Sequence, residues 1–542
     1  MCYNLFNHKQ LGAHMHSIVF YQEGQLYLNL SVPLDLACHN PLEALRRLFW
    51  SLDYRCFTRE KKVGGRPHAI TARQMVFILV YARLHGCFSS REVEALCQRD
   101  LVCIHVLEGR KAPDHSTIDR FIRMNGEAIR NIFAQSVKKL DGLGELKREI
   151  AFIDGTKVES KAGKYTFVWL KAIEKNLPKL IGHIRKLYGE YLLHYDLEAT
   201  IDVCDEQDAR AALAVMLENV DPERMFLRPV KRGRGHHLPF EARLANRLVE
   251  YAEKLDRYVS ARDRMRAEHR KSMSKTDADA TFMRMKEDYM RNGQLKPAYN
   301  IQNIVDSGYI VSTYCSRDRT DYHTLVPAME QVVHRLGFQY QGVCADSGYD
   351  CVENYRYLDE QKMIAYIKTQ TFEQSRKRSF GKDPGSKFAM TYEAKHDQLR
   401  CINNTILHNT GRKRYGATVY QAKRGCVGCR LRSSCMKSQA SRSQFKQIQY
   451  HPEAEAFRLQ ALQNITNGKG VELRVNRSIQ AEGSFSLIKD GLGIRRFLHK
   501  GLLNVETEWI LLCMATNTLK LQNKINAGTV GIPSWYYINN TG

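Results

Sequence analysis

The sequence has no run of about 18 or more apolar residues, which is the length that a membrane-spanning helix requires. Its first residues, MCYNLFNHKQLGAHMH, also lack the apolar core of a secretory signal. We therefore expect no membrane partner and a protein that stays in a reducing cytosol. In that compartment the 15 cysteines are free thiols or metal ligands rather than disulfides.

Acidic residues are scarce relative to basic ones. The 542 residues include 82 Lys and Arg but 58 Asp and Glu, which gives a formal charge of +24. A charge this positive favours an anionic partner, and nucleic acid is the leading candidate. The alternative is a soluble enzyme that is basic for other reasons. The hydrophobic content of 43 % is that of a folded protein, and the length predicts several domains.

The first part of the chain divides into two segments. Weak alternation of apolar and polar residues predicts a short β-hairpin within the N-terminal segment 1–40. Helical periodicity over 41–145 predicts a helical domain, and Ser89 and Glu92 have the spacing of a capping box for one of its helices. Short, arginine-rich helices with tight turns are compatible with a helix-turn-helix DNA reader, although other helical bundles share this pattern.

Beyond this helical domain, strands that alternate with helices predict a mixed sheet with helices packed on it. Two segments interrupt this pattern: a charged, mostly helical insertion and a polar, basic insertion. The predicted boundaries are 146–169, 297–368 and 475–525 for the mixed region, 170–296 for the helical insertion, 369–474 for the basic insertion, and 526–542 for a tail.

Three acidic residues stand out in the mixed region. The apolar run at 150–154 predicts a buried strand with Asp154 at its carboxyl end, although an aspartate that caps a turn is the common alternative. The stretch YQGVCADSGYD predicts a second buried strand that ends at Asp346. The stretch RSIQAEGSFSLIKDGLGIRRFLHK, at 477–500, predicts a helix entrance that carries Glu482.

These three carboxylates could form one site. Acids at the carboxyl ends of strands collect along one edge of an open α/β sheet, and a helix beside that edge can bring the third. Three oxygen ligands suit the hard cations Mg²⁺ or Mn²⁺. Two such ions about 4 Å apart can activate a water and stabilise a leaving oxygen during attack on phosphorus. The sequence therefore predicts a metal-dependent phosphoryl-transfer site.

Basic residues surround Glu482 in the sequence. If Glu482 binds a catalytic cation, these side chains are placed to bind the phosphates of a nucleic acid. The predicted phosphate-binding residues are Arg477, Lys489, Arg495, Arg496 and Lys500. The alternative is that a lone acid among bases forms a solvated ion pair.

A cysteine cluster lies in the basic insertion. Cys426 and Cys429 are separated by two residues and followed by Cys435, and paired thiolates on a tight turn suit tetrahedral Zn²⁺. Cys401 is the nearest candidate for a fourth ligand, and the sequence GRKRYGATVYQAKRG between them predicts a β-ribbon. An insertion rich in Lys and Arg buries little apolar surface, so a structural zinc would help it fold. The alternative is a set of free thiols in a loop.

Three motifs, in this order, resemble those of DDE transposases of bacterial insertion sequences. They are FIDGTKVES at 152–160, VCADSGYD at 343–350 and NRSIQAEGSFSLIKDGLGIRRF at 476–497. The resemblance covers about residues 40–520, and HSTIDRFIR at 115–123 is similar to the end of the helical N-terminal domain of these proteins. It implies an α+β or α/β fold with a ribonuclease-H-like mixed sheet flanked by helices, a helical N-terminal domain, a helical insertion and a Cys-containing insertion.

The resemblance also implies an activity. Asp154, Asp346 and Glu482 would be the DDE triad, Mg²⁺ the cofactor, and the double-stranded DNA of transposon ends and target the substrate. Water would first cut the end of the element, and the freed 3′-hydroxyl would then attack target DNA without a covalent enzyme intermediate. Cutting two ends in one complex implies at least a homodimer. Such a protein would act at the nucleoid in the bacterial cytoplasm.

One group of these transposases has Tyr and Arg at fixed offsets before the Glu and a Lys seven residues after it. Lys489 fits this pattern, but Val475 and Ser478 fill the upstream offsets and Arg477 is displaced by one residue. The role of Arg477, and a hairpin intermediate in end cleavage, are therefore left open. Two other functions also remain: a ribonuclease-H-like nuclease without end joining, and a catalytically inactive DNA-binding protein.

Overall fold

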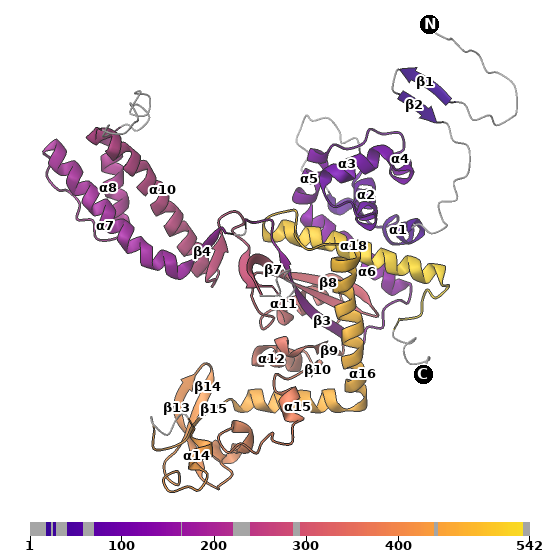
Figure 1. Ribbon diagram of the computed structural model, residues 1–542. Coiled ribbons are helices and arrows are strands. Elements are labelled where there is room, and N and C mark those ends of the chain that lie inside the picture. Colours follow the sequence, from indigo (N-terminus) through magenta and orange to yellow (C-terminus); the bar gives the residue numbers. More distant parts are fainter. Residues whose placement is uncertain are drawn as a thin grey trace.

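The computed structural model describes residues 18–22, 25–28, 41–57, 70–163, 165–220, 239–285, 293–437 and 443–534. It is a mixed α/β fold with a helical N-terminal region (Figure 1). Most of the N-terminal segment 1–40 and the end of the 526–542 tail lie outside the described residues. The predicted N-terminal hairpin is confirmed, because β1 (Ile18–Gln22) and β2 (Gln25–Leu28) pair antiparallel.

The N-terminal region contains six helices among the described residues. They are α1 (Leu42–Phe49), α2 (Ala72–Leu84), α3 (Ser90–Arg99), α4 (Leu101–Leu107), α5 (His115–Met124) and α6 (Gly126–Gly142). The predicted capping box at the start of α3 is confirmed: the Glu92 amide donates to the Ser89 hydroxyl, and the Ser89 amide donates to the Glu92 carboxylate. The sequence of helix α2 is apolar on nearly all sides, and the helix is accordingly buried on nearly all sides.

The central sheet has the strand order β10-β9-β3-β7, with β8 and β6 both pairing with β7. Its strands are β3 (Ile150–Glu159), β6 (Thr281–Arg284), β7 (Leu295–Asp306), β8 (Tyr309–Ser316), β9 (Gly342–Ala345) and β10 (Ile364–Ile367). Strands β3, β9 and β10 are parallel, whereas β7 is antiparallel to β3, β6 and β8. Ser307 and Gly308, both at positive φ, make the tight turn between β7 and β8.

Helices α11 (Leu325–Leu336), α12 (Val352–Glu360), α15 (Pro452–Thr466) and α16 (Gly468–Arg477) accompany this sheet. The long helix α18 (Leu502–Asn526) contacts strand β8 as well as helices α1, α2, α5 and α6. A single apolar core consequently runs from the N-terminal helices through α18 into the sheet. Figure 1 shows α18 lying across the interface of these two regions.

A helical arm projects from the sheet (Figure 1). It consists of α7 (Leu170–Tyr195), α8 (Glu206–Asn219) and α10 (Phe240–Ala267), which share an apolar core of their own. Strands β4 (Phe167–Trp169) and β5 (Ser272–Ser274) pair antiparallel with one another. The segment 170–296 is therefore not helical throughout, because its last part forms β5 and the sheet strand β6.

A small antiparallel sheet lies in the basic insertion. Its strands, in spatial order, are β11 (Thr391–Glu393), β12 (Gln398–Arg400), β13 (Ile406–Arg414), β14 (Ala417–Ala422) and β15 (Gln447–Tyr450). The predicted β-ribbon is confirmed as the β13–β14 pair. The sheet buries only a small core: Leu399, Leu407, Tyr420, Ala422 and Ile448.

Candidate catalytic site

The two aspartates come from adjacent parallel strands. Strands β3 and β9 pair with Phe152 opposite Cys344, and continuing this register by two residues brings Asp154 beside Asp346. Asp346 directly follows β9, as predicted. The prediction for Asp154 was wrong in one respect: it lies in the middle of β3, because β3 continues to Glu159 along β7 after its pairing with β9 has ended.

Glu482 does not lie at a helix entrance, so this prediction was also wrong. Helix α16 begins at Gly468, and the chain continues helically through a π-helical turn at Ser478–Glu482. A short α segment, α17 (Gly483–Ser486), and a second π-helical turn at Leu487–Gly491 follow. Single π turns inside α-helices often occur at functional sites.

Side-chain hydrogen bonds and ring contacts tie the Glu482 helix to the sheet. Asn303, which pairs with Asp154 across β3 and β7, accepts from Trp509 Nε1 at 2.9 Å and donates to Ser484 Oγ at 3.3 Å. Phe485 packs against Trp509 with ring centroids 6.1 Å apart. Because Ser484 lies two residues after Glu482, these contacts fix the helix relative to the strand that carries Asp154.

Arg477 connects two of the three predicted catalytic acids. Its Nη2 lies 2.8 Å from Glu482 Oε1, and its Nη1 lies 3.7 Å from Asp154 Oδ2. Burial raises the pKa of Asp154 to about 6, against the opposing effect of Arg477, while the charges of Asp346 and Glu482 raise it further. Burial lowers the pKa of Arg477, but Asp154, Glu482 and Asp346 together outweigh this and raise it. The site thus gathers negative charge around one guanidinium.

A fourth carboxylate, Asp321, lies at the same site and was missed in the sequence. Its Oδ1 accepts hydrogen bonds from the side chains of Asn300 and Gln302, at 2.8 and 2.9 Å. A Cβ on Gly348 would lie 3.0 Å from Asp321 Oδ2 and 2.9 Å from Asp346 Oδ1, so the absence of a side chain at this glycine lets the two acids approach. Asp321 lies in the loop after β8, and the rule applied to the other aspartates would have drawn attention to this loop.

The other predicted phosphate-binding residues occupy different environments. Arg496 donates to the backbone carbonyls of Ser160 and Ala162, at 3.0 and 2.8 Å, so its guanidinium holds the end of β3. Arg495 pairs with Asp490 at 2.8 Å, and Lys489 is buried. Lys500 is exposed. Their contact with DNA stays a prediction.

Among the residues that the structure describes, no three His, Cys, Asp or Glu side chains are arranged so that they could hold a metal ion as they stand. The donor chemistry of the predicted triad nevertheless suits a hard divalent cation, because all of its ligand atoms are carboxylate oxygens. In this structure the carboxylates of Asp154 and Glu482 contact the Arg477 guanidinium, whereas in a metal site they would contact the ion.

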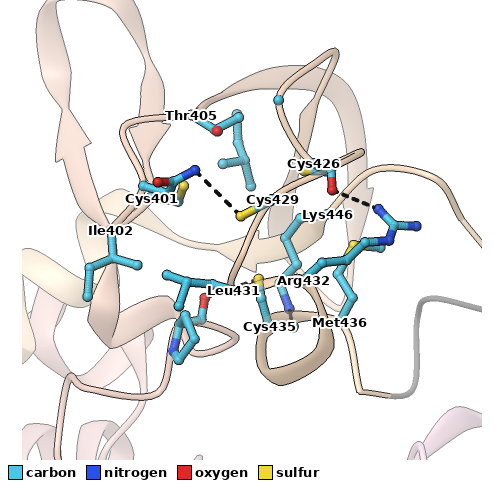
Figure 2. Close-up of a pocket in the computed structure, with 14 residues that line it drawn as sticks. Cys401, Ile402, Thr405, Cys426, Cys429, Leu431, Arg432, Cys435, Met436 and Lys446 are labelled. Atoms are coloured by element: carbon cyan, nitrogen blue, oxygen red, sulfur yellow. Dashed lines mark hydrogen bonds between the residues drawn. The ribbon is translucent and has the colours of Figure 1, made fainter.

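The four predicted zinc ligands line one pocket in the basic insertion (Figure 2). Cys401 follows β12, Cys426 and Cys429 follow β14, and Cys435 ends the short helix α14 (Arg432–Cys435). Burial raises the pKa of the Cys435 thiol, Lys446 lowers it, and the other three cysteines raise it. The structure therefore brings the four thiols together but does not arrange them as a ligand set.

Two family models match the chain. A transposase domain (DUF772) matches residues 36–124, and a transposase DDE domain matches residues 400–522. No curated protein and no solved structure matches it. The two matches support an insertion-sequence DDE transposase, which confirms the resemblance found in the motifs. Glu482 and the cysteine cluster lie within the second match, whereas Asp154 and Asp346 lie outside both.

A transposase of this class acts on DNA and belongs to the metal-dependent nucleases and strand transferases.

Within the described part of the chain, every helix is too short or too polar to cross a lipid bilayer.

Proposed function

We propose that the protein binds the terminal inverted repeats of its insertion sequence, cleaves DNA and joins the 3′ ends to target DNA. The observation that carries this proposal is the meeting of Asp154 and Glu482 around Arg477, with Asp346 beside Asp154. These residues come from three distant parts of the chain. Acids that are brought together from separate elements repel one another and reduce stability, so such a cluster is a candidate for a functional site.

The strand order supports a ribonuclease-H-like core. Strand β3 lies centrally, with the parallel strands β9 and β10 on one side and the antiparallel strand β7, followed by β8, on the other. We propose that this sheet is the catalytic core and that α1–α6 read DNA. We further propose that the active form is a homodimer or higher oligomer, since two ends are cut and joined together.

We propose that Asp154, Asp346 and Glu482 hold Mg²⁺ or Mn²⁺. When bound, two such ions would supply an activated water and neutralise the leaving oxygen at phosphorus. The chain itself orients the acids: the Gly348 amide donates to Asp346 Oδ1 at 2.7 Å, and Arg477 positions Glu482. Basic side chains on the following segment, such as Lys500, would bind DNA phosphates.

The test uses DNA that carries the inverted repeats flanking the coding region. We expect the full chain with Mg²⁺ to nick these ends and to join them to a second, labelled duplex, because a DDE site uses one pocket for both steps. Sequencing gels would resolve nicked and joined products. Nicking without joined product would favour the nuclease, and binding without metal-dependent cutting would favour the inactive DNA-binding protein.

We propose a structural Zn²⁺ in the basic insertion. Its four cysteines line one pocket, and Gly425 and Gly428, both at positive φ, form tight turns around Cys426 and Cys429. The sheet beside them buries few apolar side chains, so a metal would add stability that its core does not supply. Cys435 Sγ lies 3.3 Å from the Pro384 carbonyl and would have to turn away from it.

Metal analysis tests this site directly. Protein purified under reducing conditions is expected to contain about one zinc per chain, because four thiolates complete a tetrahedral site. The Cys429→Ser variant should lose most of it. Cys204→Ser is the matched control, since Cys204 is exposed on the helical arm. Wild-type protein without zinc would rule the site out.

A further inference from the structure

The Arg477 guanidinium lies between two of the proposed metal-binding acids. It contacts Asp154 and Glu482, and the Arg477 side chain is only 16 % exposed. Glu482 is 54 % exposed, so solvent competes for its carboxylate while Arg477 holds it on the side of Asp154. An arginine that is largely buried against several acids is a fixed counter-charge rather than a solvated surface side chain.

The π-helical turn explains how the sequence produces this contact. Arg477 and Glu482 are five residues apart, and in an α-helix residues at this spacing point in different directions. A π turn widens the helix so that its hydrogen bonds run between residues five apart, which brings these two side chains to one side. The turn spans Ser478–Glu482, directly after Arg477. The helical irregularity and the ion pair are therefore one feature.

The helix is fixed independently of this ion pair. Gln480, inside the π turn, accepts from the Gly308 amide at 2.8 Å, and Ser484 accepts from Asn303 at 3.3 Å. Loss of Arg477 would therefore leave Glu482 on an anchored backbone, close to the two aspartates. The effect of the arginine on cation binding can thus be separated from folding of the helix.

We propose that Arg477 competes with the catalytic cation for Asp154 and Glu482, and so acts as a positioning residue that restrains metal loading. This inference rests on the proposed function, because it takes these acids as the metal ligands. A guanidinium and a divalent cation cannot occupy the same space between two carboxylates, and their like charges repel. The arginine must move before the ion binds.

The test measures Mn²⁺ binding to the full chain without DNA, from the electron paramagnetic resonance signal of free Mn²⁺. We expect Arg477→Gln to bind Mn²⁺ roughly tenfold more tightly than the wild type, because it removes one positive charge from the site. Arg477→Lys should fall between them, since a lysine cannot contact two carboxylates with a planar fork. Arg356→Gln is the matched control, because exposed Arg356 pairs with Glu453 and not with these acids.

Thermal unfolding gives a second readout. Without added metal, Arg477→Gln should melt below the wild type because three acids lose their counter-charge. Saturating Mn²⁺ should remove this difference, since a ligand that binds only the folded state stabilises it. Unchanged or weaker Mn²⁺ binding by Arg477→Gln would overturn the inference.

The Asp154→Asn variant separates this outcome from failure of the proposed function. If it loses Mn²⁺ binding while Arg477→Gln has no effect, the metal site stands and only the competition is wrong. If wild-type protein and Arg477→Gln bind no Mn²⁺, or if Asp154→Asn binds it normally, both proposals fall.

Discussion

Replacing Asp346 with Asn is expected to reduce strand cleavage at the element's ends by about a thousandfold or more. The substitution keeps the size and shape of the side chain, and its Oδ1 can still accept from the Gly348 amide, which lies 2.7 Å from it in the wild type. It removes the negative charge that a divalent cation requires. Nicking of end-bearing DNA with Mg²⁺, measured under single-turnover conditions, checks this result.

Binding of the ends should persist in the same variant, because the change removes no positive charge. A gel-shift titration at fixed salt measures it. Asp359→Asn is the control for a change of one charge, since Asp359 is exposed at the end of α12. Cleavage by Asp346→Asn within a few-fold of wild type would remove this residue from the proposed triad.

Trp509→Ala is expected to have the largest effect on stability, about 3–5 kcal/mol. The Trp509 side chain is fully buried in α18, packs against Phe485 and Phe497, and donates to Asn303. Its removal leaves a large cavity and an amide oxygen without its donor. The midpoint of urea unfolding, followed by far-UV circular dichroism, measures the loss.

Trp50→Ala is the matched control, because Trp50 is 43 % exposed at the end of α1. Trp50→Ala should lower the free energy of unfolding much less than Trp509→Ala does. Trp509→Phe should fall between them, since it keeps most of the packing but loses the hydrogen bond to Asn303. Equal midpoints for the two alanine variants would show that the Trp509 contacts do not hold the Glu482 helix on the sheet.

Local patterns predicted much of the fold. The capping box at Ser89 depends on neighbouring residues only, and it occurs as predicted. The strand that ends before Asp346 and the β13–β14 ribbon are also local features. Each is encoded within fewer than about twenty residues, which is the range over which periodicity and turn chemistry are informative.

The errors concern long-range pairing. Nothing near Asp154 indicates that β3 continues beside β7, because that pairing partner lies far along the chain. The π turn at Glu482 depends on anchoring by the β7–β8 turn and by Asn303, neither of which a helical pattern contains. The small sheet in the basic insertion combines short strands with little apolar character, so only its β13–β14 ribbon was predicted from the sequence.

The continuous core that joins α1–α6 to the sheet through α18 has a consequence for accuracy in cutting. If these helices bind a specific DNA sequence, the shared core keeps them at a fixed distance from Asp154, Asp346 and Glu482. The protein would then fix the number of base pairs between the bound sequence and the scissile bond. Inserting base pairs between the bound sequence and the original scissile bond should leave the cut at the same distance from the bound sequence, so the original bond is no longer the one that is cut.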